Sequence, residues 1–307
     1  MKFSKWILGA ALLFSAQVTS VQAAGSCDPC DPCYDSNPCD LCDIDWCDVE
    51  FDFYIDALYW EVCKGDHNVA ENNDGKEKYL DTCYDWGWRL GAVARWKCWD
   101  LGLRFAKYCT DASTKIPENA TEVDDGKAKF DFDYRVFDIE LGYTCCLPCC
   151  SISLRPIAGV KMAWIDDDYD KSDIFFSSNS KVDFCGYGLY IGTSARWELC
   201  SYCACDRDIP IALVARASTA LLRGEFEQDV ETNAPGGGDI GCECLYVPVH
   251  ELYVGLDFSF CDLCGCGDAF FQIGYETQYW GWREYNQSED ITHLGLGGMV
   301  MRFGFGF

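Results

Sequence analysis

Residues 151–166 read SISLRPIAGVKMAWID. Every even position from Ile152 to Trp164 is apolar, whereas Arg155 and Lys161 occupy odd positions between them. An alternation with a period of two is the pattern of a β-strand with one apolar and one polar face. The stretch is much longer than a typical strand of a globular protein, which has about five or six residues. It therefore predicts a long strand that separates an apolar from a polar environment.

The same alternation recurs from residue 50 to the C-terminus and predicts about ten strands, within a range of about 8–12. Short connections alternate with longer ones rich in Asn, Asp, Gly and Ser. Long strands, an even strand number and alternating short turns and long loops are typical of a transmembrane β-barrel. We therefore predict an all-β fold, a transmembrane antiparallel β-barrel over residues 50–307. The predicted strands cover 50–62, 84–96, 99–109, 127–144, 151–166, 181–198, 209–227, 246–260, 268–282 and 293–307.

The fourth predicted strand contains a change of phase. Its apolar residues are even-numbered from Phe130 to Tyr134 and odd-numbered from Phe137 to Leu141. One extra residue in a strand shifts the following side chains to the other face. A single apolar face over the whole strand therefore requires a β-bulge, which we predict near Val136.

The N-terminus has the form of a secretory signal. Lys2 and Lys5 precede the apolar run 6–16, and Val21-Gln22-Ala23 is a small-residue cleavage site. We predict a signal peptide over residues 1–23, cleaved near Ala23. Residues 24–49 form a Cys-, Asp- and Pro-rich tail with seven Asp and no Lys or Arg. Because this tail has little apolar periodicity, we expect an irregular periplasmic segment.

Charge and composition exclude several function classes. Lys plus Arg number 24 and Asp plus Glu number 50, which gives a formal net charge of −26. This balance argues against nucleic acid as a partner, because nucleic-acid binding needs a basic surface. With 3 His and no G-x-S-x-G or H-E-x-x-H motif, the sequence predicts no enzyme, no cofactor and no metal site.

The polar faces of the predicted strands carry charged side chains. Such residues are costly in a packed core but suit a wet lumen. Basic and acidic residues balance on these faces, so we expect weak ion selectivity, with any cation preference arising at the mouths. The predicted pore-lining residues are Asp52, Asp56, Arg89, Arg95, Arg104, Asp131, Asp133, Arg135, Arg155, Lys161, Arg196, Arg216, Glu276 and Arg302. Four further acidic residues on the same faces are Asp138, Glu140, Glu251 and Asp257.

Aromatic residues near the strand ends fit the interfacial girdles of a membrane barrel. The alternative for each of them is ordinary core packing. The girdle candidates are Tyr59, Trp60, Trp86, Trp88, Trp96, Trp99, Trp164, Trp197, Tyr279, Trp280 and Trp282.

The chain has 23 Cys, which suits an oxidising compartment. Most of them lie in the tail and in the predicted short turns, which face the periplasm in such barrels. An odd number leaves at least one thiol without a partner in its own chain, so we predict disulfide cross-links to other envelope proteins. The alternatives are intrachain disulfides, including a local Cys63–Cys83 pair, and structural zinc at C-x-x-C pairs. The cross-link candidates are Cys27, Cys30, Cys33, Cys39, Cys42, Cys47, Cys63, Cys83, Cys145, Cys146, Cys149, Cys150, Cys200, Cys203, Cys205, Cys261, Cys264 and Cys266.

Several segments resemble the Legionella-type major outer-membrane porin family and the cysteine-rich outer-membrane porins of chlamydia-like bacteria. They include DALYW at 56–60, DWGWRLG at 85–91 and DIELGY at 138–143, with further stretches at 154–166, 218–226, 275–280 and 294–307. The resemblance implies a pore-forming outer-membrane barrel, a monomer or an oligomer, with no catalytic residues. We therefore expect an outer-membrane porin for passive diffusion of small hydrophilic solutes. The alternative is a structural or adhesin-like barrel with a closed lumen, and in both cases we expect outer-membrane lipid as a partner.

Overall fold

The computed structural model describes residues 49–64, 68–71, 77–79, 82–115, 127–147, 151–172, 177–204, 207–232, 241–260, 267–281 and 293–307. In these residues no helix is long and apolar enough to cross a membrane. The predicted signal peptide and nearly all of the predicted tail lie outside the described residues.

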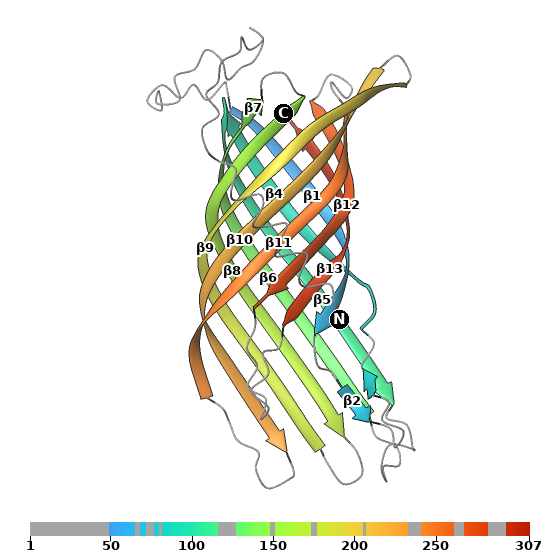
Figure 1. The fold of residues 1–307 in the computed structure, drawn as a ribbon, viewed down its shortest axis with the longest axis vertical. Helices are drawn as coiled ribbons and strands as arrows, with labels where there is room; N and C mark the ends of the chain where they lie inside the picture. Colours follow the sequence, from blue (N-terminus) through green and yellow to red (C-terminus); the bar gives the residue numbers. More distant parts are fainter. Residues whose placement is uncertain are drawn as a thin grey trace.

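Ten antiparallel strands close into a barrel (Figure 1). Each barrel strand pairs with its neighbours in the chain, and β1 pairs with β13. The short strand β7 (Cys145–Leu147) follows β6 in the chain and pairs with β8, and β6 also pairs directly with β8. Phe51 and Phe307 exchange two backbone hydrogen bonds of 3.0 Å where the first and last strands meet. The barrel strands are β1 (Val49–Lys64), β4 (Asp85–Trp96), β5 (Trp99–Lys115), β6 (Lys127–Tyr143), β8 (Ile152–Ser172), β9 (Ser177–Ala204), β10 (Arg207–Thr232), β11 (Gly241–Phe260), β12 (Asp268–Trp280) and β13 (Leu294–Gly306).

The prediction of an all-β antiparallel barrel of about ten strands is confirmed. Several strands are longer than predicted, and β10 continues to Thr232. The sequence also did not reveal β7 or a small hairpin of β2 (Asn68–Glu71) and β3 (Glu77–Tyr79). We call the end of the barrel with the Lys97–Cys98 turn and the C-terminus the short-turn end, and the opposite end the loop end.

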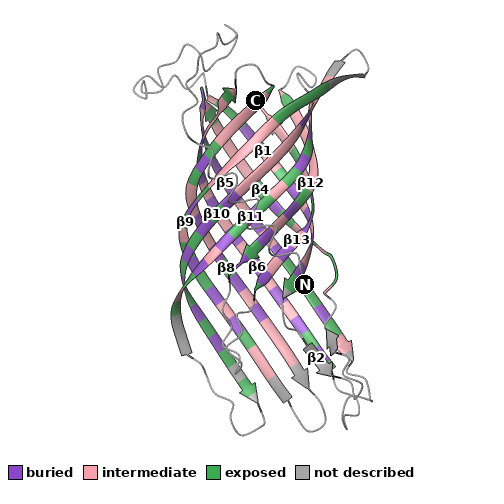
Figure 2. Ribbon diagram, in the orientation of Figure 1, coloured by how far each residue is buried: buried purple, intermediate pink, exposed green. Residues whose placement is uncertain are grey.

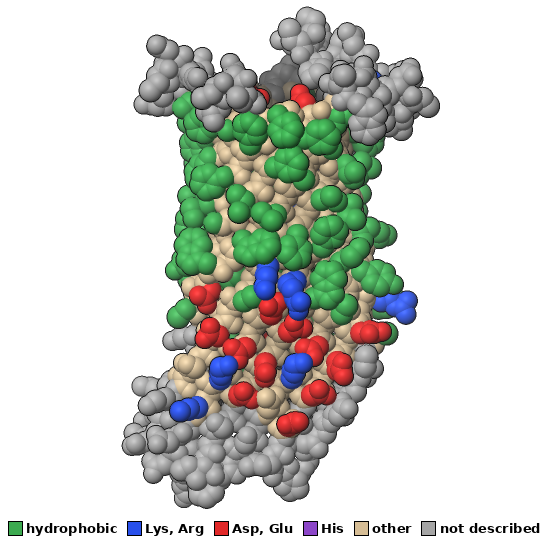
Figure 3. Space-filling model, turned by 180° about the vertical axis from the view of Figure 1, so that it is seen from behind, with side chains coloured by type: hydrophobic (Ala, Val, Ile, Leu, Met, Phe, Trp, Pro, Cys, Tyr) green, Lys and Arg blue, Asp and Glu red, His purple; other side chains and the backbone are tan. Residues whose placement is uncertain are grey.

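The outer surface changes character along the barrel axis (Figures 2 and 3). Nearest the short-turn end, exposed apolar side chains of the described strands form a belt. Nearer the loop end, charged side chains replace them. The belt includes Phe53, Ile55, Leu90, Leu101, Leu103, Leu141, Leu189, Ile191, Leu221, Leu252, Val254, Met299 and Phe303. The charged residues, which we call the collar, are Asp111, Lys127, Lys129, Asp131, Asp133, Arg135, Asp166, Asp168, Asp170, Lys181, Asp183, Arg223, Glu225, Glu227, Asp229 and Glu231.

The interior changes in the opposite sense. On β6, Asp138 and Glu140 point inward beneath the belt, whereas Phe130, Phe132 and Tyr134 point inward beneath the collar. The barrel is therefore apolar outside and charged inside at the belt, and charged outside and apolar inside at the collar. The belt is the part that suits lipid, and the collar has the polarity of a barrel in water.

This inversion corrects two sequence predictions. The pairing of β6 with β5 and β8 runs without a register shift from Lys127 to Gly142, so no β-bulge occurs near Val136. The apolar residues change phase because the buried face itself changes from charged to apolar. As a consequence, Asp131, Asp133 and Arg135 lie on the outer surface in the collar and do not line the interior.

The aromatic girdle prediction is partly wrong. Trp86, Trp88, Trp164, Trp197 and Tyr279 are exposed on the outer surface, as a girdle requires. Trp60 and Trp280 are fully buried because they point into the barrel. Tyr59, Trp96 and Trp99 are half-buried, and Trp282 lies outside the described residues.

The belt gives a direct test of which surface meets lipid. Replacing Ile191, an exposed belt residue on β9, by arginine is expected to destabilise the barrel by roughly 2–4 kcal/mol in a bilayer. Glu227→Arg in the collar on β10 is the matched control and should change the stability little. Urea unfolding in lipid vesicles measures both, and equal effects would show that the belt is misplaced.

Candidate functional site

The interior of the barrel is the candidate functional site. Strand alternation directs the predicted pore-lining residues inward, apart from the three collar residues already corrected. The inward set is Asp52, Asp56, Arg89, Arg95, Arg104, Arg155, Lys161, Arg196, Arg216, Glu276 and Arg302, and Asp138, Glu140, Glu251 and Asp257 join it. That these residues line an open pore remains a prediction, because their ion pairs fill much of the lumen.

One cluster joins strands β1, β4, β12 and β13. Arg89 donates hydrogen bonds to Glu276 at 2.8 and 3.0 Å and to Asp56 at 3.1 Å. Arg302 binds the same Asp56 carboxylate through its Nε at 2.7 Å and its second amine at 2.9 Å. Each central group therefore has two partners of opposite charge. The side chains of Arg89 and Asp56 are 3% and 0% exposed, so the centre of this cluster is buried.

A second cluster crosses the whole lumen. Arg104 on β5 donates to Asp138 at 2.8 Å through its Nε and contacts Glu251 on β11 at 3.3 Å. Strands β5 and β11 are five places apart in the ring of ten, which puts them on opposite walls. The Lys161 ammonium, 1% exposed, lies 2.8 Å from both Asp138 and Glu251. We call these two clusters together, without Arg302, the ion-pair layer.

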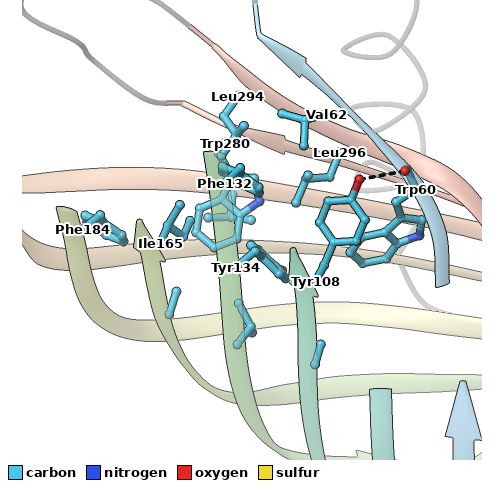
Figure 4. Packing of buried hydrophobic residues seen from close by; sticks show 14 of the residues in the cluster. Trp60, Val62, Tyr108, Phe132, Tyr134, Ile165, Phe184, Trp280, Leu294 and Leu296 are labelled. Carbon is cyan, nitrogen blue, oxygen red and sulfur yellow. Dashed lines mark hydrogen bonds between the residues drawn. The ribbon is translucent and has the colours of Figure 1, made fainter. Parts of the chain in front are cut away.

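An aromatic layer lies next to the ion-pair layer, towards the loop end (Figure 4). It consists of Trp60, Tyr108, Tyr134 and Trp280, all at most 1% exposed. The Trp60 ring centroid lies 5.9 Å from that of Tyr108 and 6.2 Å from that of Tyr134. The Arg89 guanidinium stands 5.4 Å from the Trp60 ring, so the two layers are in contact.

The aromatic layer also spans the lumen. The Tyr134 hydroxyl on β6 donates to the Gln278 side chain on β12 at 2.8 Å, and these strands again lie on opposite walls. Gln278 in turn donates to Glu276 at 2.8 Å. The described side chains therefore close the barrel at two successive levels. The narrow interior of a small barrel makes such filling possible, because wide aqueous channels occur in barrels of about 16–18 strands.

Between these layers and the short-turn end, the contacts among the described side chains reach only part of the way across. Arg155 and Arg216 both bind Glu140, at 2.8 and 2.6 Å, and the Tyr190 hydroxyl donates to it at 2.8 Å. Arg155 also pairs with Asp100. The close approach of Arg155 depends on Gly142, because a Cβ there would lie 2.4 Å from the Arg155 Nε.

A separate pair lies at the same end of the lumen. Arg196 on β9 pairs with Asp257 on β11, and Gln272 donates to the same carboxylate at 2.7 Å. The sequence analysis predicted Arg196 and Asp257 as inward-facing residues. It did not predict three other residues that take part in the contacts of the lumen, namely Asp100, Tyr190 and Gln278. The alternation in residues 99–109 was a sufficient signal for Asp100, because it shares a face with Arg104.

Outside the barrel, the collar carries acidic side chains opposite one another. Asp131 faces Asp168, and Asp166 faces Asp183, across neighbouring strands. Asp131, Asp166 and Asp168 border a hollow of about 460 Å³. Among the described residues, no group of three or more His, Cys, Asp or Glu side chains has the arrangement of a metal site.

One collar carboxyl shows the effect of this crowding. Burial, together with nearby Asp170 and Asp131, raises the pKa of Asp168 above its usual value. The charged form is therefore disfavoured in the folded protein, and Asp168→Asn should stabilise the barrel by about 0.5–1 kcal/mol at pH 7. The gain should vanish below the pKa of Asp168, where the native side chain is also neutral. Thermal unfolding at pH 7 and pH 3 checks this.

The control for that prediction is a carboxylate with a partner. Asp166 accepts a hydrogen bond from Arg135 at 2.5 Å, so Asp166→Asn should bring no gain at pH 7. A gain of equal size in both variants would mean that the net charge of the chain, rather than the position of Asp168, determines the effect.

The described cysteines lie at several levels of the barrel. Cys63, Cys83 and Cys200 are exposed free thiols and Cys145 is a half-buried one, so the predicted local Cys63–Cys83 pair is not formed. Cys146 is exposed on β7. Cys98, in the turn between β4 and β5, is buried and disulfide-bonded. Cys203 lies in β9, and with Cys200 it belongs to a strand rather than to the predicted turn. The other candidates fall outside the described residues: Cys27, Cys30, Cys33, Cys39, Cys42, Cys47, Cys149, Cys150, Cys205, Cys261, Cys264 and Cys266.

Comparison with known proteins identifies sequences and structures that this chain resembles. A family model described as the Legionella pneumophila major outer membrane protein precursor matches residues 47–295. No curated protein sequence matches the chain significantly. The outer membrane protease OmpT from Escherichia coli is 9% identical, with 84% of this chain and 96% of that chain covered and a TM-score of 0.43. A major outer membrane protein from Thermus thermophilus is 10% identical, with 84% and 99% covered and a TM-score of 0.36.

Proposed function

This chain belongs to the family of the Legionella pneumophila major outer membrane protein, and from that premise we propose that its barrel is a narrow pore for small hydrophilic solutes, closed at rest. It is an outer-membrane β-barrel protein. The observation that supports a pore is the charged filling of the lumen at the level of the belt. The proposal involves no catalytic step.

The charged side chains in the lumen are informative because the same barrel also contains a level that is filled by aromatic side chains. Burying ion pairs costs desolvation energy, and apolar side chains of similar volume fill a core at least as stably. The aromatic layer shows that this sequence builds an apolar filling in the same barrel. Closing the lumen at the level of the belt therefore does not by itself require charged side chains. Charged side chains also provide polar contacts that replace the water around a hydrophilic solute.

The pairing of these charges also suggests how the lumen opens. Asp56 is shared by Arg89 and Arg302, and Glu251 is shared by Arg104 and Lys161. A side chain with two partners can release one contact while it keeps the other, which lowers the cost of each rearrangement compared with breaking an isolated buried pair. In this mechanism the aromatic side chains next to the layer must move as well.

Reconstitution into planar bilayers tests the pore. We expect discrete conductance steps that are small and infrequent, since both layers must rearrange before ions pass. Heat-denatured protein from the same preparation is the control. Absence of steps at high protein load, with correct folding verified by circular dichroism, would contradict the proposal.

A second candidate function is a closed barrel with a structural or adhesive role. The observation that favours it is the aromatic layer, whose four side chains are at most 1% exposed and reach across the lumen. This candidate predicts a silent bilayer record for the wild type. It also predicts that enlarging the ion-pair layer alone would not produce conductance.

We also propose that cysteines at the short-turn end and in the tail cross-link the barrel to other cysteine-rich envelope proteins or to further copies. Support comes from the exposed free thiol of Cys200 near that end. Electrophoresis of whole envelopes without reductant should show high-mass species that dithiothreitol converts to a single band. A single band of monomer mass under both conditions would restrict the disulfides to the chain itself.

A further inference from the structure

The ion pairs on the short-turn side of the ion-pair layer are unequally exposed. In each of them the arginine is more accessible than its carboxylate partner. Arg95 is 51% exposed and Asp52 9%, Arg196 is 32% and Asp257 1%, and Arg302 is 23% and Asp56 0%. Arg155 is 20% exposed against 6% for Asp100, and Arg216 is 19% against 8% for Glu140. The carboxylates are thus covered by the guanidinium groups that bind them.

Water reaches this part of the lumen. The inward-facing neighbours Tyr54, Ser194, Val214 and Gln272 are half-buried, whereas the side chains of the ion-pair layer and of the aromatic layer are buried. We call this accessible part of the interior the vestibule. Its described wall presents four arginines, Arg155, Arg196, Arg216 and Arg302, and none of the carboxylates that pair with them is more than 8% exposed. Arg95 lies further out, opposite the exposed Glu50.

The outer rim of the vestibule differs from its wall. Glu50 and Asp268 are exposed at the starts of β1 and β12, and Glu198 is exposed on β9. Charges that face bulk solution are screened within about 8 Å at physiological salt, whereas charges inside a low-dielectric wall act more strongly on an ion that has entered. The arginines therefore determine the local environment of an ion within the vestibule, although the chain as a whole is acidic.

We propose that the vestibule is a binding site for small anions that carry oxyanion groups, such as inorganic phosphate or a carboxylate. Guanidinium groups donate paired N–H bonds to such oxygens, and each arginine is held in place by its buried partner. Arg155 and Arg216 both donate to Glu140, so their guanidinium groups meet at one carboxylate, and this is the position where we expect one anion to contact both. The inference deepens the proposed pore function by naming its preferred solute charge, and the anion site itself does not depend on permeation.

This inference replaces the expectation of weak selectivity with cation preference at the mouths. That expectation rested on a balance of formal charges along the strands. In the folded barrel the balance persists, but the two signs are not equally accessible. A permeating or entering ion meets positive charge, so the preference is for anions.

The first test uses wild-type protein and needs no conductance. Folded barrel in detergent is treated with phenylglyoxal, an arginine reagent, with and without inorganic phosphate, and modified residues are identified by mass spectrometry. Phosphate at ten times its Kd should slow modification of Arg155 and Arg216 about tenfold. Arg223, an exposed collar residue on the outer surface, is the internal control and should be unaffected. Equal modification with and without phosphate at both vestibule positions would overturn the proposal.

The second test measures selectivity in bilayers under a KCl gradient. We expect a reversal potential on the chloride side for the wild type. Arg216→Gln should reduce the chloride-to-potassium permeability ratio, and Glu140 keeps Arg155 as its partner in this variant, whereas Arg216→Lys, which retains the charge, should not. A conducting barrel that prefers potassium would overturn the anion preference while it supports the pore. A silent barrel would contradict the pore, and phosphate protection would then decide the anion site alone.

Discussion

Lys161→Met is expected to destabilise the barrel by about 3–5 kcal/mol. Lys161 lies 2.8 Å from both Asp138 and Glu251, and all three side chains are buried. Methionine fills a similar volume but leaves two carboxylates with Arg104 as their remaining cation. Urea titration of the folded barrel in detergent, followed by tryptophan fluorescence, measures the loss.

Two variants separate loss of charge balance from loss of packing. Lys107→Met removes a half-exposed lysine on the outer surface and should cost little. Lys161→Met combined with Glu251→Gln restores the balance, so it should recover a large part of the lost stability. If the double variant lost as much stability as the two single substitutions together, the unpaired charge in the ion-pair layer would not be the cause of the destabilisation.

Trp60→Ala is expected to have an effect of similar size, about 3–5 kcal/mol. The Trp60 side chain is fully buried in the aromatic layer, and its removal leaves a cavity between Tyr108, Tyr134 and Arg89. The same titration measures it, at a second emission wavelength that corrects for the lost tryptophan.

Trp86 provides the matched control, because it lies on the outer surface with 61% exposure. Trp86→Ala should cost clearly less than Trp60→Ala in detergent. The opposite order would place Trp60 outside the barrel and would restore the girdle role that its sequence position suggested.

The sequence was sufficient to predict the strands because alternation with period two depends on local residue order alone. Long strands such as Ile152–Ser172 carry enough repeats to identify both faces. The ends of these strands at the loop end were harder to predict. In the collar the strands continue the same hydrogen-bonded ladder, but the side chains on their outer face are charged. An apolar outer face is a requirement of lipid, so the apolar alternation stops where the lipid contact stops, although the strand itself continues.

The errors share one physical cause. Asp131, Asp133 and Arg135 were assigned to the lumen, and Trp60 and Trp280 to the surface, on the assumption that the outer face is apolar along the whole strand. The barrel reverses its polarity at the collar. The change of phase in residues 127–144 was the local sign of this reversal, but it was interpreted as a β-bulge. Contacts across the lumen, such as that between Arg104 and Glu251, depend on how the ten strands close into a ring. The residue pattern of a single strand therefore could not predict them.

The central claim is that the ion-pair layer, in series with the aromatic layer, limits passage through the lumen, so that removing part of the ion-pair layer leaves the aromatic layer as the main obstacle. Single-channel conductance of the double variant Lys161→Ala/Glu251→Ala, compared with the wild type, tests it most directly. The two substitutions remove opposite charges and keep the Arg104–Asp138 pair, so the layer is enlarged without a change of net charge. We predict larger and more frequent conductance steps than in the wild type. Unchanged conductance in a correctly folded double variant would contradict the claim.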